Sequence, residues 1–186
     1  MNYLFTSTDK DIFQNPEFLA PLEYIKRVTV KSITINDKGE YGFVTNPIHG
    51  FYLLAGGGAE SDDLEVEIKR ECDEELNVEV EVLSKVGIAR DYRNRSSKEY
   101  DTTCFLTKVI GELKEDTRTE DEKSNGLHPV WICEEEAMRV MTQQQEKIER
   151  KEVAFYNTAF DMARDVRFFI EYLHCVDKKT GNISLI

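Results

Sequence analysis

Four acidic side chains between residues 53 and 78, in LLAGGGAESDDLEVEIKRECDEELNV, have the types and spacing of a metal site. Glu71, Glu74 and Glu75 are spaced i, i+3 and i+4, so they project from one side of a helix, with Glu67 one turn earlier. Like charges at this spacing cost roughly 0.2–0.5 kcal/mol per pair. A divalent cation such as Mg²⁺ removes that cost, because hard cations prefer carboxylate oxygens. The alternative is a solvent-exposed acidic face.

Three consecutive glycines, Gly56 to Gly58, precede this acidic segment. Glycine lets the backbone approach a ligand closely and leaves its carbonyl groups accessible. A phosphate-binding loop of the P-loop type would need Lys and then Ser or Thr after the glycines. Here GAES is followed by aspartates, which disfavours anion binding at this helix start.

The same residues resemble the signature of the Nudix hydrolase family. That signature is a glycine, five residues, a glutamate, seven residues, and then Arg-Glu-hydrophobic-x-Glu-Glu-x-Gly-hydrophobic. RECDEELNV supplies six of its slots with Arg70, Glu71, Cys72, Glu74, Glu75 and Val78, and LLAGGGAE resembles the LPGGGxE that usually precedes it. The motif covers about 25 residues, and the order of the strands extends the resemblance over about 23 to 141.

The chain departs from this signature at three points. Asn77 replaces the final glycine, and Asn is the next-best residue for a left-handed helix C-cap. Ala55 replaces the usual proline. The segment before Arg70 is one residue short, so the first acidic slot is filled either by Asp62, counted from Gly56, or by Asp63, counted from Gly57.

The resemblance implies a role for each matching residue. Glu71, Glu74 and Glu75 would hold Mg²⁺ or Mn²⁺, helped by a carbonyl at Gly56 or a neighbour, and Arg70 would orient the carboxylates. The family often uses one more acid from a loop before the last strand. The loop KEDTRTEDEKSNG offers Glu120 and Glu122, of which we prefer Glu122, and an ordinary solvated turn is the alternative there.

These roles imply an enzyme of the Nudix pyrophosphohydrolase type, which cleaves a diphosphate linkage in a nucleoside diphosphate derivative. Glu74, Glu75, Arg70 and Glu122 are the catalytic candidates, and the identity of the general base stays open. A nucleoside di- or triphosphate is favoured as substrate, with a nucleotide sugar of the ADP-ribose type as the alternative. An alternative of another class is a catalytically silent nucleotide-binding regulatory module.

Residues that bind the rest of the substrate are not identified by any marker of a family branch. Tyr92, Arg93, Arg95 and Tyr100 could stack on a base and pair with phosphate. A hairpin with ordinary surface residues explains them equally well.

The elements that must position these residues alternate between strands and helices. Strands are expected at 23 to 36, within YGFVT, at 51 to 55, from 78 to 93, from about 100 and around HPVWI. A helix from Asp62 to about Leu76, with Ser61 as N-cap, would bury the stripe Leu64, Ile68, Cys72 and Leu76. We therefore predict an α/β fold: a Nudix-like α/β/α sandwich with a mixed sheet.

The whole chain, 1–186, is expected to form a single Nudix-like domain, with an N-terminal arm at about 1–20. A further helix is expected near Glu134, and a long C-terminal helical segment at about 142–176. That segment carries an apolar stripe at steps of four and three, which predicts a helix–helix seam: Phe155, Ala159, Met162, Val166, Phe169 and Leu173. The seam would cover the chain's own sheet or form a homodimer, and charges such as Asp161 and Arg164 would occupy other faces.

Composition limits the partners and the compartment. A formal net charge of −12 argues against nucleic acid or an anionic membrane surface as the main partner. No signal peptide is evident, and no apolar run approaches the ~18 residues of a membrane span. Four scattered cysteines without zinc-site spacing indicate buried thiols in a reducing cytosol, so a cytoplasmic location is expected.

Overall fold

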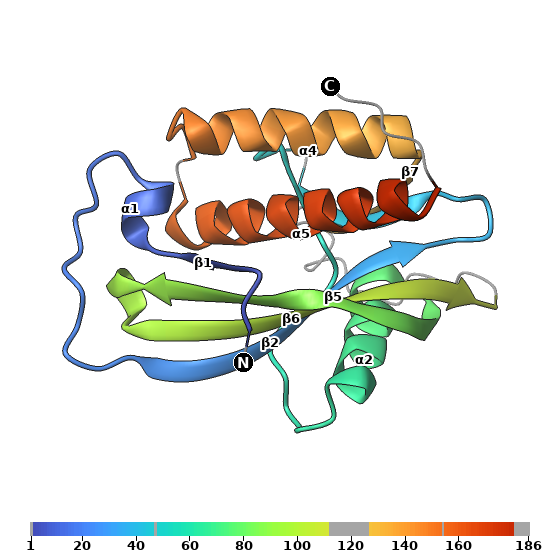
Figure 1. Cartoon of the computed structure of the whole chain (residues 1–186), viewed down its shortest axis with the longest axis horizontal. Helices are drawn as coiled ribbons and strands as arrows, with labels where there is room; N and C mark the ends of the chain where they lie inside the picture. Colours follow the sequence, from blue (N-terminus) through green and yellow to red (C-terminus); the bar gives the residue numbers. More distant parts are fainter. Residues whose placement is uncertain (1, 47, 112–126, 154, 181–186) are drawn as a thin grey trace.

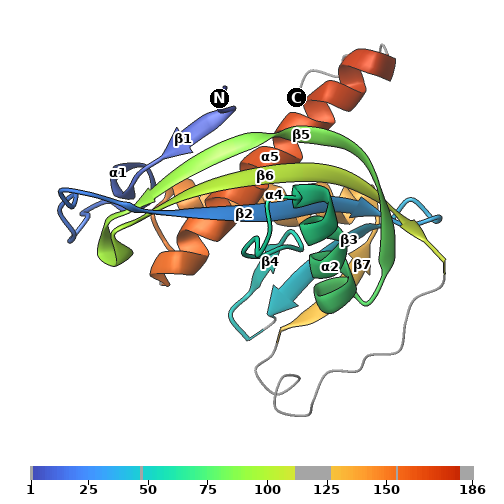
Figure 2. The same cartoon turned by 90° about the horizontal axis from the view of Figure 1, so that it is seen from below.

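The computed structural model describes residues 2–46, 48–111, 127–153 and 155–180, which form three layers. A mixed, strongly curved β-sheet lies in the middle, with α2 (Leu64–Leu76) on one face. Two helices, α4 (Glu134–Glu149) and α5 (Tyr156–Thr180), cover the other face (Figures 1 and 2). The predicted α/β/α sandwich is therefore confirmed.

The sheet is built on two long antiparallel strands, β5 (Glu79–Arg93) and β6 (Lys98–Ile110). Next to β6 lies β2 (Ile25–Ile35), which runs parallel to it. The sheet continues from β2 to β3 (Tyr41–Asn46), and β3 pairs antiparallel with both β4 (Phe51–Leu53) and β7 (His128–Ile132). These pairings make the sheet mixed, as expected from the sequence.

The N-terminal arm contributes more to the sheet than its sequence suggests. The arm contains a short helix, α1 (Asp9–Ile12). Just before it, β1 (Phe5–Ser7) pairs in parallel with β5 and forms one edge of the sheet. A three-residue strand carries too little alternation to be read from the sequence alone.

Each face of the sheet buries its own apolar cluster. On one face, Ile68, Cys72 and Leu76 of α2 are buried against Val30 and Phe105, and Leu64 packs at the edge of this cluster. The predicted stripe of α2 is therefore confirmed. The cluster on the other face includes Phe43, Met141, Phe168 and Phe169, which join the sheet to α4 and α5. Within the described residues, no helix is long and apolar enough to cross a membrane.

The C-terminal helical segment is not continuous, contrary to the expectation for 142–176. α4 ends at Glu149, and Lys151 takes a left-handed conformation with φ of 59°. The chain then reverses into α5, which begins at Tyr156. Neither Gly nor Pro marks this break, so the local sequence gives little sign of it.

The apolar stripe of α5 packs inside the subunit. Ala159, Met162, Val166 and Phe169 are all buried, whereas Phe155 precedes the helix and is exposed. The seam therefore covers the chain's own core and offers no surface to a second subunit. Arg164 and its neighbour Asp165 lie off the apolar stripe, as expected, but they are buried as well, because they face the sheet and pair with Asp91 of β5 and Lys31 of β2.

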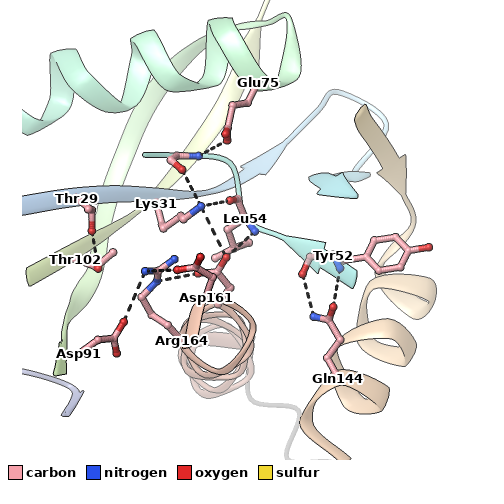
Figure 3. A network of polar contacts seen from close by, with 12 residues as sticks. Thr29, Lys31, Tyr52, Leu54, Glu75, Asp91, Thr102, Gln144, Asp161 and Arg164 are labelled. Atoms are coloured by element: carbon pink, nitrogen blue, oxygen red, sulfur yellow. Dashed lines mark hydrogen bonds and ion pairs between the residues drawn. The ribbon is translucent and has the colours of Figure 1, made fainter. Parts of the chain in front are cut away.

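A side chain from α4 completes the hydrogen bonding of the short strand β4, which leads into the glycine loop. The Gln144 amide accepts a hydrogen bond from the Tyr52 N–H at 2.6 Å and donates one to the Tyr52 carbonyl at 3.0 Å (Figure 3). Gln144 thus takes the place of a neighbouring strand. Because these groups are largely shielded from water, the paired contact fixes the start of the loop.

The end of α2 has the cap that the sequence predicts. Asn77 is left-handed, with φ of 57° and ψ of 40°, and its N–H donates to the Cys72 carbonyl. Asn tolerates this conformation better than other residues that carry a Cβ, which explains how the chain does without glycine here.

Substitutions at Asn77 should follow the steric cost of its left-handed conformation. We expect Asn77→Gly to be neutral or mildly stabilising and Asn77→Val to lower the free energy of unfolding by about 1–2 kcal/mol. Urea and thermal unfolding of the two variants and the unaltered chain would measure this. A valine variant as stable as the unaltered protein would contradict the cap explanation.

Candidate active site at the glycine loop and the acidic helix

The glycine loop lies directly against β2. Val30 N–H donates to the Gly57 carbonyl at 3.0 Å, and Ser32 N–H donates to the Ala55 carbonyl at 2.9 Å. At Gly56 φ is +135°, and a Cβ would lie 2.1 Å from the Val30 carbonyl oxygen. Only glycine can occupy position 56, so these contacts set the path of the backbone next to the acidic helix.

α2 begins at Leu64, directly after the acidic pair Asp62 and Asp63 that follows the loop. The N-cap is Asp63, whose carboxylate accepts from the N–H groups of Glu65 and Val66, both at 3.2 Å. The predicted N-cap, Ser61, is wrong: its hydroxyl hydrogen-bonds Glu67 instead. Asp63 is thus engaged in capping the helix, while Asp62 is exposed.

Arg70 binds three acids of the helix at once. Its guanidinium donates to Glu67 at 2.9 Å, to Glu71 at 2.7 Å and to Glu74 at 2.8 Å. A further bond of 3.1 Å goes to the Gly58 carbonyl, which ties the helix to the loop. One cation therefore offsets the repulsion within the acid row, while the Glu74 side chain keeps 57% of its surface exposed.

Glu71 and Glu75 face the glycine loop. The Glu75 carboxylate accepts a hydrogen bond of 2.6 Å from the Gly56 N–H (Figure 3). The Glu71 carboxylate lies so close to Gly57 that a Cβ there would be 2.7 Å from one of its oxygens. Burial raises the pKa of both carboxyl groups, and neighbouring acids raise it further, against the effect of Arg70 on Glu71 and of Lys31 on Glu75.

A buried lysine, which the sequence analysis does not single out, stands on the sheet side of the loop. Lys31 Nζ donates to the Leu54 carbonyl at 2.7 Å and to the Gly56 carbonyl at 2.8 Å (Figure 3). The carboxylate of Asp165 lies 3.9 Å from the same nitrogen. The available signal is a lysine within VTVKSITI, where all neighbours suit a buried strand.

A cavity of about 290 Å³ opens beside the loop and Lys31. It is walled by β2, the β5–β6 hairpin, the loop and α5, through Thr29, Lys31, Gly56, Gly57, Gly58, Arg93, Tyr100, Asn157, Asp161 and Arg164. Of the four hairpin residues considered for substrate binding, Arg93 and Tyr100 line it. Tyr92 instead packs against Tyr24, and Arg95 lies over Phe18 and Tyr156.

The wall formed by α5 and β5 is a buried network of ion pairs. Arg93 donates to Asp161 at 2.7 Å and stacks between Tyr100 and a phenylalanine of α5. Arg164 contacts Asp161 at 3.1 Å and Asp165 at 3.0 Å (Figure 3). The charges compensate one another, as buried ions require, and they hold both arginines at the edge of the cavity. Sequence periodicity places Asp161 and Arg164 off the apolar stripe but does not indicate that they form a buried network.

The acids fit a divalent cation in their chemistry, since Mg²⁺ and Mn²⁺ prefer hard oxygen donors. Within the described residues, however, no three His, Cys, Asp or Glu side chains already converge on a common point. Arg70 holds Glu71 and Glu74, and the Gly56 N–H holds Glu75. The carboxylates would have to move toward a common point to take up a metal ion. The Gly56 carbonyl fits less well, because it already accepts from Lys31.

The remaining site candidates, Glu120 and Glu122, lie outside the described residues. Of the other predicted residues, Arg70, Glu71 and Glu74 form one hydrogen-bonded group. Glu75 and Gly56 form a second group across the loop. Both groups meet the same glycine run.

Comparisons with known proteins give structural likenesses but no sequence match. No protein-family model and no curated protein matches the chain. Among solved structures, a MutT protein from Methanosarcina mazei Go1 is 16% identical with a TM-score of 0.49, and the match covers 79% of this chain and 97% of that one. A NUDIX hydrolase from Nitrosomonas europaea is 16% identical with a TM-score of 0.45, over 75% and 89% of the two chains.

A UDP-X diphosphatase is also 16% identical with a TM-score of 0.45, over 61% of this chain and 53% of that one. The match therefore spans about half of that protein's length. At these identities and TM-scores the likenesses say nothing about activity. Any function must be inferred from the residues of this chain.

An alanine substitution should destabilise the protein at Gly56, the first residue of the glycine run, but not at Gly58, the last. Gly56→Ala forces a Cβ against the Val30 carbonyl at a φ that L residues rarely adopt. We expect it to lower the free energy of unfolding by about 3 kcal/mol or more. Gly58→Ala is the matched control, because its Cβ would meet only Arg27 at an ordinary 3.8 Å. Urea unfolding that finds both variants equally stable would contradict the described loop.

The Glu67 contact should persist to lower pH than the contacts of Glu71 and Glu75, because the pKa of Glu67 is lowered and theirs are raised. Hydrogen bonds from Ser61, the Glu60 N–H and Arg70 lower the pKa of Glu67 to about 2 from an ordinary 4.5. A lowered folded-state pKa means that the contribution to stability is present above about pH 4.5 and is lost as the pH falls toward 2. Glu67→Gln should therefore be less stable at pH 7 and lose less stability over that acid range. Glu65→Gln, on the exposed side of the same helix, should keep the acid dependence of the unaltered chain.

Proposed function

We propose that this protein is a Mg²⁺- or Mn²⁺-dependent pyrophosphohydrolase of the Nudix type that cleaves the diphosphate linkage of a nucleoside diphosphate derivative. The observation that supports this most directly is the composition of the site around the glycine loop. Oxygen donors, Glu71 and Glu75, meet the loop on the helix side, while Lys31, Arg93 and Arg164 line the adjoining cavity. A diphosphate needs both, since its oxygens are neutralised by cations and its metal ion is held by carboxylates.

Each residue has a defined task in this proposal. Glu71, Glu74 and Glu75 would hold the divalent cation, which supplies charge neutralisation at the diphosphate oxygens when bound. Arg70, bonded to Glu71 and Glu74, would keep their carboxylates oriented toward the loop. A carboxylate would accept the proton of the attacking water within hydrogen-bond reach. Glu74, Glu75 and Glu122 are the candidates for that base.

The cavity favours a substrate that extends beyond its diphosphate. Tyr100 contributes an aromatic face beside Arg93, which suits a ring stacked near a phosphate. A nucleoside di- or triphosphate is our preferred substrate, and a nucleotide sugar of the ADP-ribose type is the alternative. The four cysteines are free thiols, which is consistent with a reducing cytosol as the working compartment.

A second candidate function is a nucleotide-binding module without catalysis. Two observations favour it: Lys31 already occupies the Gly56 carbonyl, and the carboxylates of Glu71, Glu74 and Glu75 each have a partner within the protein. Such a module would bind nucleotides through the cavity without hydrolysing them. Phosphate release from a nucleotide library, measured with Mg²⁺, with Mn²⁺ and with EDTA, separates the two functions.

Removing the charge from two acids of the helix should abolish turnover while leaving the fold intact. We expect Glu74→Gln combined with Glu75→Gln to lower kcat by about 10²–10⁴-fold, the range that a positioned acid or base contributes. Glu65→Gln is the matched control, because Glu65 is an exposed acid on the same helix. Circular dichroism would check the fold of each variant. Full Mg²⁺-dependent turnover in the double variant would refute the assignment of these acids.

A further inference from the structure

Lys31 has the surroundings of a bound cation. Its side chain is only 9% exposed, and Nζ donates to two backbone carbonyl groups, those of Leu54 and Gly56. Carbonyl oxygens and a nearby carboxylate are also the ligands that hard metal ions prefer. The ammonium group therefore stands where the loop presents its oxygens to a positive charge.

The partners of Lys31 are themselves held in place. Asp165 lies 3.9 Å from Nζ, and its two oxygens accept from the Leu54 N–H and from Arg164, both at 3.0 Å. On the other side of the loop, Glu75 accepts from the N–H of Gly56, whose carbonyl Lys31 binds. The ammonium is thus fixed by β2, the loop and α5 together, and it cannot move aside without breaking two short hydrogen bonds.

We propose that the Lys31 ammonium is a resident cation of the acidic site, which takes the Gly56 carbonyl and restricts divalent cations to the carboxylates of α2. This inference rests on the proposed function for the identity of the incoming ion. A metal ion on the Gly56 oxygen would meet a second positive charge on the same atom. The site therefore takes fewer divalent ions, or takes them more weakly, than its acids alone would allow. The loop also keeps its shape when no metal is bound.

Removing the ammonium should make the Gly56 carbonyl oxygen available to a metal ion. Mn²⁺ binding to the unaltered chain, Lys31→Met and Lys31→Gln is measured by calorimetry and by electron paramagnetic resonance. We expect the Lys31 variants to bind one more Mn²⁺ than the unaltered chain, or to bind Mn²⁺ at least about tenfold more tightly. Lys108→Met is the matched control, because Lys108 is half-exposed and pairs with Asp37 away from the loop. Binding by the Lys31 variants that equals that of the control overturns the proposal.

Thermal unfolding gives a second readout, which does not require activity. EDTA should leave the melting temperature of the unaltered chain unchanged, whereas the Lys31 variants should melt lower in EDTA and recover with Mn²⁺. If the variants fail to fold, anomalous scattering from crystals of the unaltered chain soaked in Mn²⁺ decides the matter. Mn²⁺ found on the acids of α2 alone supports the proposal, and Mn²⁺ found on the Gly56 carbonyl overturns it.

The two proposals fail in different measurements. Absence of metal-dependent phosphate release from any nucleotide refutes the proposed hydrolase. An increase in Mn²⁺ binding on removal of Lys31 would still support the resident cation in that case. Conversely, if the protein hydrolyses nucleotides but its Mn²⁺ binding does not change on substitution of Lys31, the proposed function stands and the resident-cation proposal is refuted.

Discussion

The close contact between the glycine loop and β2 is the constraint on which the rest of the site depends. At Gly56 the loop backbone passes so near the Val30 carbonyl that no side chain fits. This contact brings the loop carbonyl groups within reach of Lys31 on one side. It also brings the loop N–H within reach of Glu75 on the other side. A looser loop would separate the acids of α2 from the cations of the sheet and of α5.

Charge compensation then determines how these groups can be buried together. Arg70 pairs with the acids of α2, and Lys31 donates hydrogen bonds to the loop carbonyl groups. Arg93 and Arg164 share Asp161 at the wall of the cavity. Isolated ions would be costly to bury, whereas these groups are paired and hydrogen-bonded at short range. The chain can therefore keep a highly charged site inside a compact fold, with Arg93 and Arg164 held at the edge of the cavity.

The sequence pattern predicts those features that depend only on neighbouring residues in the chain. The stripe Ile68, Cys72 and Leu76, the layered mixed sheet and the left-handed Asn77 follow from periodicity and from the conformational preference of asparagine. The spacing of Glu71, Glu74 and Glu75 likewise places them on one side of α2. The roles of these acids in metal binding and catalysis are not tested by the structure and stay predictions.

The features that the sequence did not reveal depend on contacts between distant segments. Lys31 is read as an ordinary strand residue until the loop and Asp165 are placed beside it. Arg164 lies off the apolar stripe of α5, and periodicity cannot show that this side of the helix is buried against Asp91 of β5. The break at Lys151 has no helix-breaking residue, since a lysine takes the left-handed conformation there.

The hydrogen bond from the Leu54 N–H to Asp165 joins residues 111 positions apart in the chain. During synthesis the acidic helix and the glycine loop therefore leave the ribosome long before the carboxylate that completes their support. The nascent chain can pair its strands early, since β5 and β6 are adjacent in sequence, but it cannot close the site until α5 has emerged and docked. The site therefore forms only once α5 is in place, and an incompletely synthesised chain carries the acidic motif without a formed site.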